Sequence, residues 1–199
     1  MMNNILQELE AYAQKHHVPI ITKESSQLLV NTVVVKKPIA VLEIGTAIGY
    51  STILIAANLD KQTVITSIEI DPDRANIAKA YIEKARVDPE IHVLEGDAAQ
   101  ILPVLDGPFD LVFIDAAKGQ YLNYLEQVLG KLNSGAVIIA DNILFRGYIK
   151  GNVPVPRRFR TIVKRLASYL EFVTHDPRFD TVVHDIGDGV AITYYRGEI

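Results

Sequence analysis

Oxygen-bearing side chains follow two apolar stretches in the second half of the sequence. Asp115 comes directly after residues 109–114, and Asp141 and Asn142 come directly after residues 135–140. Both stretches have the composition of central parallel strands, whose carboxyl ends should meet at one edge of a sheet. Two carboxylates and an amide, without cysteine or histidine, are ligands suited to a hard cation such as Mg²⁺. The alternative is that these side chains end their strands in solvent.

A glycine turn near the start of the chain is a second candidate site. Gly45 and Gly49 separate an apolar strand-like run from an apolar helix in the segment VLEIGTAIGYSTILIAA, residues 41–57. Glycine permits a positive φ and close approach of a ligand, and the following helix directs unpaired N–H groups at it. The spacing differs from dinucleotide and phosphate-loop motifs. Because the acid Glu43 would repel phosphate, a cationic or amine-bearing ligand such as S-adenosylmethionine fits better.

Two further strand ends should lie over the same crevice. Glu69 ends an apolar run 20 residues after Gly49, the separation at which a strand-helix-strand unit brings a carboxylate beside a nucleotide ribose. The alternative is a solvated acid at a strand end. Gly96, Asp97 and Ala98 end a third strand-like run, and an adenine edge would rest at this turn.

The elements that position these residues follow from periodicity. Helices are expected over residues 3–16, 25–36, 50–58 and 72–86, and strands over 41–44, 63–71, 91–95, 109–114 and 135–140. Two strand-like runs around Gly187, Asp188 and Gly189 predict a C-terminal hairpin and therefore an antiparallel edge. His16 and His17, between the first two helices, are interpreted as a surface loop and not as a metal site.

Composition limits the class of protein. With 199 residues, 49% of them apolar, the chain should form one domain. Cysteine is absent, which excludes disulfides and thiolate metal sites. No apolar run approaches the length of a membrane span, and acids stand where a signal peptide would carry basic residues, so a soluble cytoplasmic protein is expected.

A basic segment contrasts with the net charge of −4. Residues 146–166 contain no acid, so they could bind the phosphates of a nucleic acid. They could equally be the solvated face of a helix whose apolar side packs inward. The basic residues of this segment are Arg146, Lys150, Arg157, Arg158, Arg160, Lys164 and Arg165.

The motifs LEIGTAIGYS, IEID, GDA, FIDAAKGQY and ADN occur in this order along nearly the whole chain. Together they resemble the cation-dependent O-methyltransferases related to catechol and caffeoyl-coenzyme A methyltransferases. More narrowly, EAYAQKHHVPI, DNILFRG, RRFR and GDGVAI are similar to segments of bacterial tRNA 5-hydroxyuridine methyltransferases. The resemblance implies an α/β, Rossmann-like methyltransferase fold with a seven-stranded, mostly parallel sheet of six parallel strands and one antiparallel, and a homodimer.

The resemblance also implies roles for single residues. Glu43 and Ser51 would bind the methionine end of S-adenosylmethionine, Glu69 the ribose and Ala98 the adenine region, while Ile21 would make a backbone contact. Asp115, Asp141 and Asn142 would hold Mg²⁺, and Lys118 would be the catalytic lysine. The implied acceptor is 5-hydroxyuridine at the tRNA wobble position, gripped through its anticodon loop by the basic segment.

Other functions remain open from the sequence. The first alternative is a small-molecule catechol-type O-methyltransferase, although the aromatic gatekeepers of catechol enzymes are missing, since the chain has no Trp and residues 116 and 117 are both alanine. A second is a module that binds cofactor and RNA without catalysis. A dehydrogenase is disfavoured because the chain lacks a dinucleotide turn.

Overall fold

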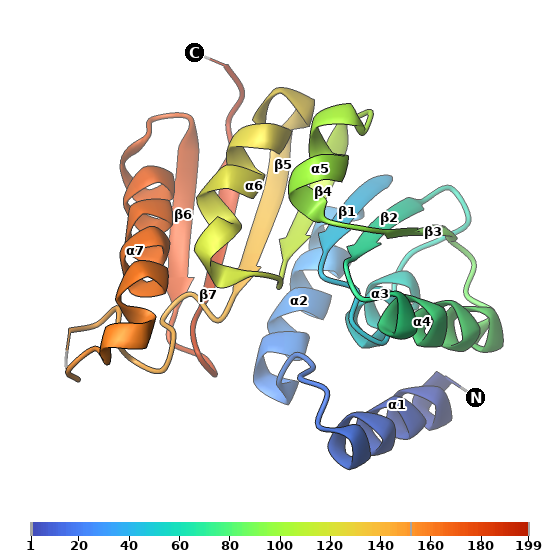
Figure 1. Cartoon of the computed structure of the whole chain (residues 1–199). Coiled ribbons are helices and arrows are strands. Elements are labelled where there is room, and N and C mark those ends of the chain that lie inside the picture. The colour runs from blue at the N-terminus through green and yellow to red at the C-terminus, as the bar shows by residue number, and fades with distance from the viewer. Residues whose placement is uncertain (1, 152, 199) are drawn as a thin grey trace.

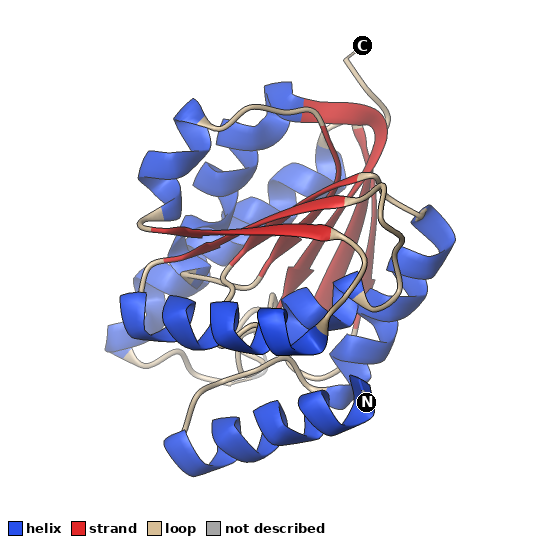
Figure 2. Cartoon of the chain, turned by 90° about the vertical axis from the view of Figure 1, so that its right-hand side faces the viewer, coloured by secondary structure: helices blue, strands red, loops and turns tan. Residues whose placement is uncertain are grey.

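The computed structural model describes residues 2–151 and 153–198. Within these residues a seven-stranded sheet lies between helices on both faces (Figures 1 and 2), in the order β3-β2-β1-β4-β5-β7-β6. The strands are β1 (Ala40–Ile44), β2 (Val64–Glu69), β3 (Glu90–Glu95), β4 (Phe109–Ile114), β5 (Leu132–Asp141), β6 (Phe179–His184) and β7 (Val190–Tyr195).

The strand directions agree with the prediction. Strands β1 to β5 pair in parallel, and β7 is antiparallel to both of its neighbours, β5 and β6. Six of the described strands therefore run one way and one runs the other. Strand β5 begins at Leu132, before the expected start at residue 135, because Leu132 still pairs with Phe109 across an irregularity in the register.

The described helices cover the sheet in two groups (Figure 2). One hydrophobic cluster packs α1, α2, α3 and α4 against one face, and a second packs α5, α6 and α7 against the other. The α-helices are α1 (Met2–His16), α2 (Lys23–Lys36), α3 (Tyr50–Ala56), α4 (Pro72–Ala85), α5 (Ala98–Ile101), α6 (Tyr121–Val128) and α7 (Arg160–His175). Helix α6 is not among the helices expected from the sequence, although its apolar residues have helical spacing. None of the helices among the described residues is long and apolar enough to cross a lipid bilayer.

Local sequence explains where the helices near the crevice begin. Helix α2 starts two residues before the expected Ser25, because the Thr22 side chain accepts a hydrogen bond from the Ser25 N–H at 3.2 Å. Helix α4 has Pro72 in its first turn and Asp71 as its N-cap. Helix α3 follows Gly49, whose φ of 88° lies in the left-handed region. These caps fix the helix starts beside the carboxyl ends of the strands.

Candidate active site

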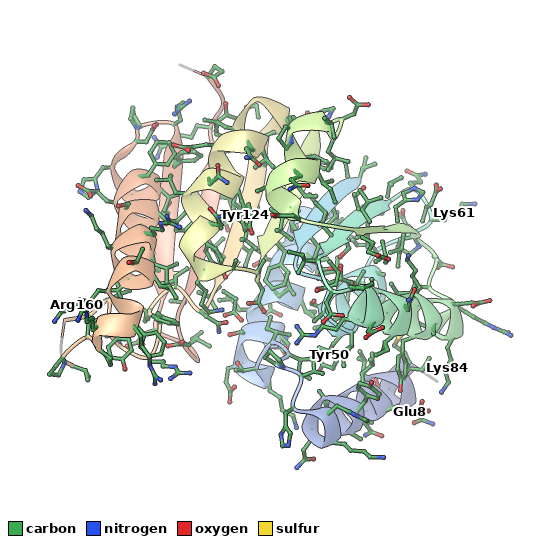
Figure 3. The ribbon with its side chains drawn as sticks, viewed as in Figure 1. Glu8, Tyr50, Lys61, Lys84, Tyr124 and Arg160 are labelled. Carbon is green, nitrogen blue, oxygen red and sulfur yellow. The ribbon has the colours of Figure 1, made fainter. Side chains whose placement is uncertain are left out.

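A cavity of about 410 Å³ opens at the carboxyl ends of β1, β2 and β4, where ligands bind in open α/β sheets. The segment between α1 and α2 closes one side of it. Tyr50 and Tyr124, labelled in Figure 3, line it from α3 and α6. The predicted site residues on its wall are Ile21, Gly45, Ser51, Glu69, Asp97, Ala98, Asp115, Lys118 and Asn142.

The two glycines of the turn have different roles. Gly45 has a φ of +106° and lines the cavity, and a Cβ there would lie 2.2 Å from the Asp115 carbonyl oxygen. Gly49 does not line the cavity; a Cβ on it would lie 3.2 Å from Cα and Cβ of Ala78. Gly45 thus keeps β1 close to β4 at the site. Gly49 instead lets α3 pack tightly against α4, so its contribution to ligand binding is indirect.

Glu69 lies on the cavity wall and is held by the backbone. Its Oε2 accepts a hydrogen bond from the Ala47 N–H at 2.7 Å, and its Oε1 accepts one from the Asp71 N–H at 3.0 Å. An ionised carboxylate offers about four lone-pair sites, so two hydroxyl donors could still be accommodated. Asp97 caps α5 by accepting from the Ala99 N–H at 2.9 Å.

Glu43 lies behind the cavity wall and not on it. It is fully buried and does not line the cavity. Its carboxylate accepts hydrogen bonds from Ser51 at 2.5 Å, from Ser67 at 2.6 Å and from Thr52. Burial raises the pKa of Glu43, and these hydroxyl groups oppose that shift. Ser51 is the member of this group that reaches the cavity, so Glu43 is one hydrogen bond away from a bound ligand.

The proposed cation ligands meet beside this cavity. Asp115 and Asn142 line it, whereas Asp141 is 1% exposed. Burial, together with the charge of Asp115, raises the pKa of Asp141 to about 6, although Ser25 and the charge of Lys118 oppose the shift. Lys118 Nζ lies 3.6 Å from Asp115 Oδ1.

The donor set fits a hard cation. The Oδ2 atom of Asp141 is buried and has no hydrogen-bond partner among the described residues. A buried, unpaired carboxylate oxygen next to a second carboxylate is unfavourable without a positive charge. The described residues contain no cluster of three or more acidic or histidine side chains that could hold a metal, so the candidate set consists of two carboxylates and one amide.

Comparison with known proteins identifies the family to which this site belongs. Residues 2–195 match the model of a family described as O-methyltransferase. The chain belongs to the O-methyltransferase family. Members of such a family transfer a methyl group to an oxygen atom, and the cavity between the glycine turn and the two aspartates is the candidate place for that reaction.

Individual relatives of this O-methyltransferase agree with the assignment. The catechol O-methyltransferase of Niastella koreensis is 38% identical over 113 residues, which cover 55% of this chain and 51% of the relative, about half its length. The caffeoyl-CoA O-methyltransferase of Medicago sativa is 30% identical over 208 residues, covering 94% of this chain and 80% of the relative. An O-methyltransferase from Bacillus cereus in complex with SAH superposes with a TM-score of 0.85 at 26% identity, covering 96% of this chain and 90% of that one.

The basic segment of the O-methyltransferase lies outside the cavity. Its predicted contact residues Arg146, Lys150, Arg157, Arg158 and Arg160 are exposed, and none lines the cavity. Lys150 pairs with Asp185, but the four arginines form no ion pair with a carboxylate in the described part of the chain; residue 152 of the segment lies outside that part. Arg160 lies on the far side of the molecule from Lys61 in Figure 3.

An aromatic cluster supports part of this segment. The guanidinium groups of Arg146 and Arg158 lie 5.3 Å and 4.6 Å from the ring centroid of Phe159. Phe159 also contacts Phe145 and Tyr148, with ring centroids 5.4 Å and 5.9 Å away. The apolar side of α7 packs inward, as one of the two sequence interpretations expected, while the arginines remain outside.

Several site residues are not found from the sequence. Tyr124 and Gln120 line the cavity, and Tyr50 lines it while donating a hydrogen bond to Glu10 of α1 at 2.9 Å. The position of Tyr50 directly after Gly49 was an available signal for it. Tyr124 lies on α6, which is not among the expected helices. The spacing of the buried Tyr121, Tyr124, Leu125 and Val128 is an available signal for the helix, but it does not place Tyr124 at the site.

Proposed function

We propose that this enzyme transfers the methyl group of S-adenosylmethionine, with Mg²⁺, to the 5-hydroxyl of 5-hydroxyuridine at the wobble position of tRNA. The observation that carries the choice of acceptor is a group of exposed arginines that follows Asn142 in the chain and forms no ion pair with a carboxylate among the described residues. An acidic protein that concentrates such arginines in one segment is suited to a polyanionic substrate.

The cavity wall has the chemistry that the cofactor requires. Ser51 and the backbone at Ile21 would contact the methionine end, and Glu43 would act through Ser51. Glu69 would accept hydrogen bonds from the ribose hydroxyls, with the adenine near Asp97 and Ala98. The acids around the cavity also favour a ligand that carries a sulfonium and an ammonium group.

Asp115, Asp141 and Asn142 would hold the Mg²⁺ ion, whose charge would lower the pKa of an acceptor hydroxyl that has a second oxygen beside it. In 5-hydroxyuridine the C5 hydroxyl and the C4 carbonyl form such a pair. The acceptor oxygen attacks the methyl carbon in line, the bond from sulfur to carbon breaks, and sulfur keeps the electron pair. In its neutral form Lys118 Nζ, 3.6 Å from Asp115, would receive the hydroxyl proton.

The arginines would bind RNA away from the reacting base. Specific RNA contact usually involves single-stranded loops whose bases are splayed out, so the anticodon loop could reach the cavity while its phosphates contact the segment. Arg146 and Arg158 lie over the ring of Phe159 and are exposed, so their guanidinium groups could bind phosphate.

The deciding experiment measures methyl transfer from labelled S-adenosylmethionine to tRNA carrying 5-hydroxyuridine, and in parallel to a simple catechol, each with Mg²⁺ and with chelator. We expect chelator-sensitive labelling of the tRNA, much faster than that of the catechol. Labelling of the catechol alone would favour the second candidate, a small-molecule O-methyltransferase, which the name of the Niastella koreensis relative supports. Binding of tRNA without labelling of either substrate would contradict both.

A matched pair of variants separates RNA binding from catalysis. Replacing Arg157, Arg158 and Arg160 with glutamine should lower kcat/KM for tRNA at least 10-fold and leave the rate with catechol unchanged. It should also reduce the salt dependence of tRNA binding, because each lost phosphate contact lowers the slope by about 1. Glutamine at Lys61 and Lys79, exposed lysines outside this segment, should change neither value. Equal effects of the two sets would contradict a specific role for the segment.

A further inference from the structure

The polar atoms of Asp141 have three distinct environments. Its Oδ1 accepts a hydrogen bond from the Ser25 hydroxyl at 3.2 Å. Its backbone carbonyl accepts one from the Tyr121 hydroxyl at 3.0 Å. Its Oδ2 is buried and has no hydrogen-bond partner in the part of the chain that the structure describes. The residue is therefore held at two atoms, and one carboxylate oxygen remains available to a ligand.

Ser25 reaches Asp141 from a rigid position 116 residues earlier in the chain. It lies in the first turn of α2, is 1% exposed, and donates its backbone N–H to Thr22 Oγ1 at 3.2 Å. The turn at Gly187 encloses its hydroxyl, because a Cβ on that glycine would lie 3.2 Å from Ser25 Oγ. The capped helix and the glycine turn together leave the Ser25 hydroxyl little freedom to move away.

We propose that Ser25 is a positioning residue for the cation site, whose hydroxyl fixes the rotamer of Asp141 so that Oδ2 faces the cation. This inference rests on the Mg²⁺ site of the proposed function. Residues hydrogen-bonded to metal ligands orient those ligands. In other metal sites, replacing such a residue usually lowers metal affinity about 10- to 100-fold. The adjacent Ser26 offers a contrast, because its hydroxyl donates to the Thr22 carbonyl at 2.5 Å and has no bond to Asp141.

The test measures Mn²⁺ affinity of the full-length protein by electron paramagnetic resonance, independently of activity. We expect Ser25→Ala to raise the Kd for Mn²⁺ by about 10- to 100-fold. Ser26→Ala should leave this Kd within about 2-fold of the wild-type value. The Kd for S-adenosylmethionine and the thermal midpoint should stay close to the wild-type values, since alanine is a good helix former. Ser25→Thr, which keeps the hydroxyl, should bind Mn²⁺ more tightly than Ser25→Ala.

Asp141→Ala distinguishes failure of this inference from failure of the proposed function. If Asp141→Ala binds Mn²⁺ as tightly as the wild type, the cation site itself is wrong. If Asp141→Ala loses binding while Ser25→Ala retains wild-type affinity, the site stands and the positioning role of Ser25 is overturned. If Ser25→Ala and Ser26→Ala lose Mn²⁺ affinity equally, and both also lose thermal stability, the start of α2 only supports the fold.

Discussion

Replacement of Gly45 by alanine should damage both the fold and the cofactor cavity. The glycine has a φ of +106°, and the new Cβ would lie 2.2 Å from the Asp115 carbonyl oxygen and 3.3 Å from Ala116 Cβ. The carbonyl belongs to the backbone after β4, and the Asp115 N–H donates to the Ile44 carbonyl at 3.0 Å. The clash can be relieved only by moving β1 and β4 apart at the candidate site.

The expected loss of stability in Gly45→Ala has two contributions. A left-handed backbone costs a residue with a Cβ about 1–2 kcal/mol, and forcing atoms into a packed region costs about 1–3 kcal/mol. Together they should lower the free energy of unfolding by about 2–5 kcal/mol. For a chain of 199 residues this corresponds to a fall in Tm of about 5–15 °C.

Gly147→Ala is the matched control, because Gly147 also has a positive φ, +74°, but no atom of the described residues outside its chain neighbours lies within 4 Å of its Cβ position. Its free energy of unfolding should fall only by the backbone contribution, about 1–2 kcal/mol. Urea unfolding followed by circular dichroism suits a chain without Trp, and titration with S-adenosylmethionine reports the cavity. Equal stabilities of the two variants, with unchanged cofactor affinity for Gly45→Ala, would refute the close-approach reasoning.

Three other predictions concern single charged groups. Burial raises the pKa of Asp110, but hydrogen bonds from Ala40 and neighbouring groups outweigh burial and lower it. Asp110→Asn should therefore lower the free energy of unfolding, measured in urea at pH 7, by about 1–2 kcal/mol. This loss should shrink as the pH falls below about 4; a loss independent of pH would argue against a stabilising role of the ionised Asp110 carboxylate. Lys131 donates to the backbone carbonyls of Leu102, Pro103 and Leu105, just after α5, so Lys131→Met should lower the free energy of unfolding by about 2 kcal/mol, whereas Lys79→Met, at an exposed lysine, should leave it unchanged. Asp141→Asn should raise the Tm of metal-free protein at pH 7.5, because the buried charge is removed, and should abolish stabilisation by Mg²⁺; a lower Tm would contradict the view that the buried charge of Asp141 destabilises the metal-free protein.

Local sequence predicts the strands and the crevice because it determines them directly. The glycine turn, the acid at Glu69 and the apolar runs before Asp115 and Asp141 are each specified within a few residues, and the carboxyl ends of parallel strands must meet. The strand directions follow from the same patterns and from the hairpin around Gly187. All of these features depend on residues that are neighbours in the chain.

Features that depend on strand register and on packing cannot be predicted from local sequence. Glu43 pairs in register with Ser67 of β2, so its carboxylate turns to the hydroxyl groups behind the wall and not to the cavity. Ser25 meets Asp141 across 116 residues, and the Tyr121 hydroxyl donates to the Asp141 carbonyl from a separate helix, 20 residues away. The residues that hold the site are therefore less predictable than the residues that form it.

Charge segregation links the cavity to the surface beside it. A cofactor with a sulfonium and an ammonium group requires acids, which the cavity supplies through Glu69, Asp97 and Asp115, whereas a polyanionic substrate requires a basic surface. A chain with a net charge of −4 can offer both only if the two charges are kept apart. The basic residues after Asn142 lie outside the cavity, although Arg74 and Lys118 line it. Under the proposed function, the arginines of this segment would attract phosphate without entering the cofactor cavity, and they would not compete with a cation for the carboxylates of Asp115 and Asp141.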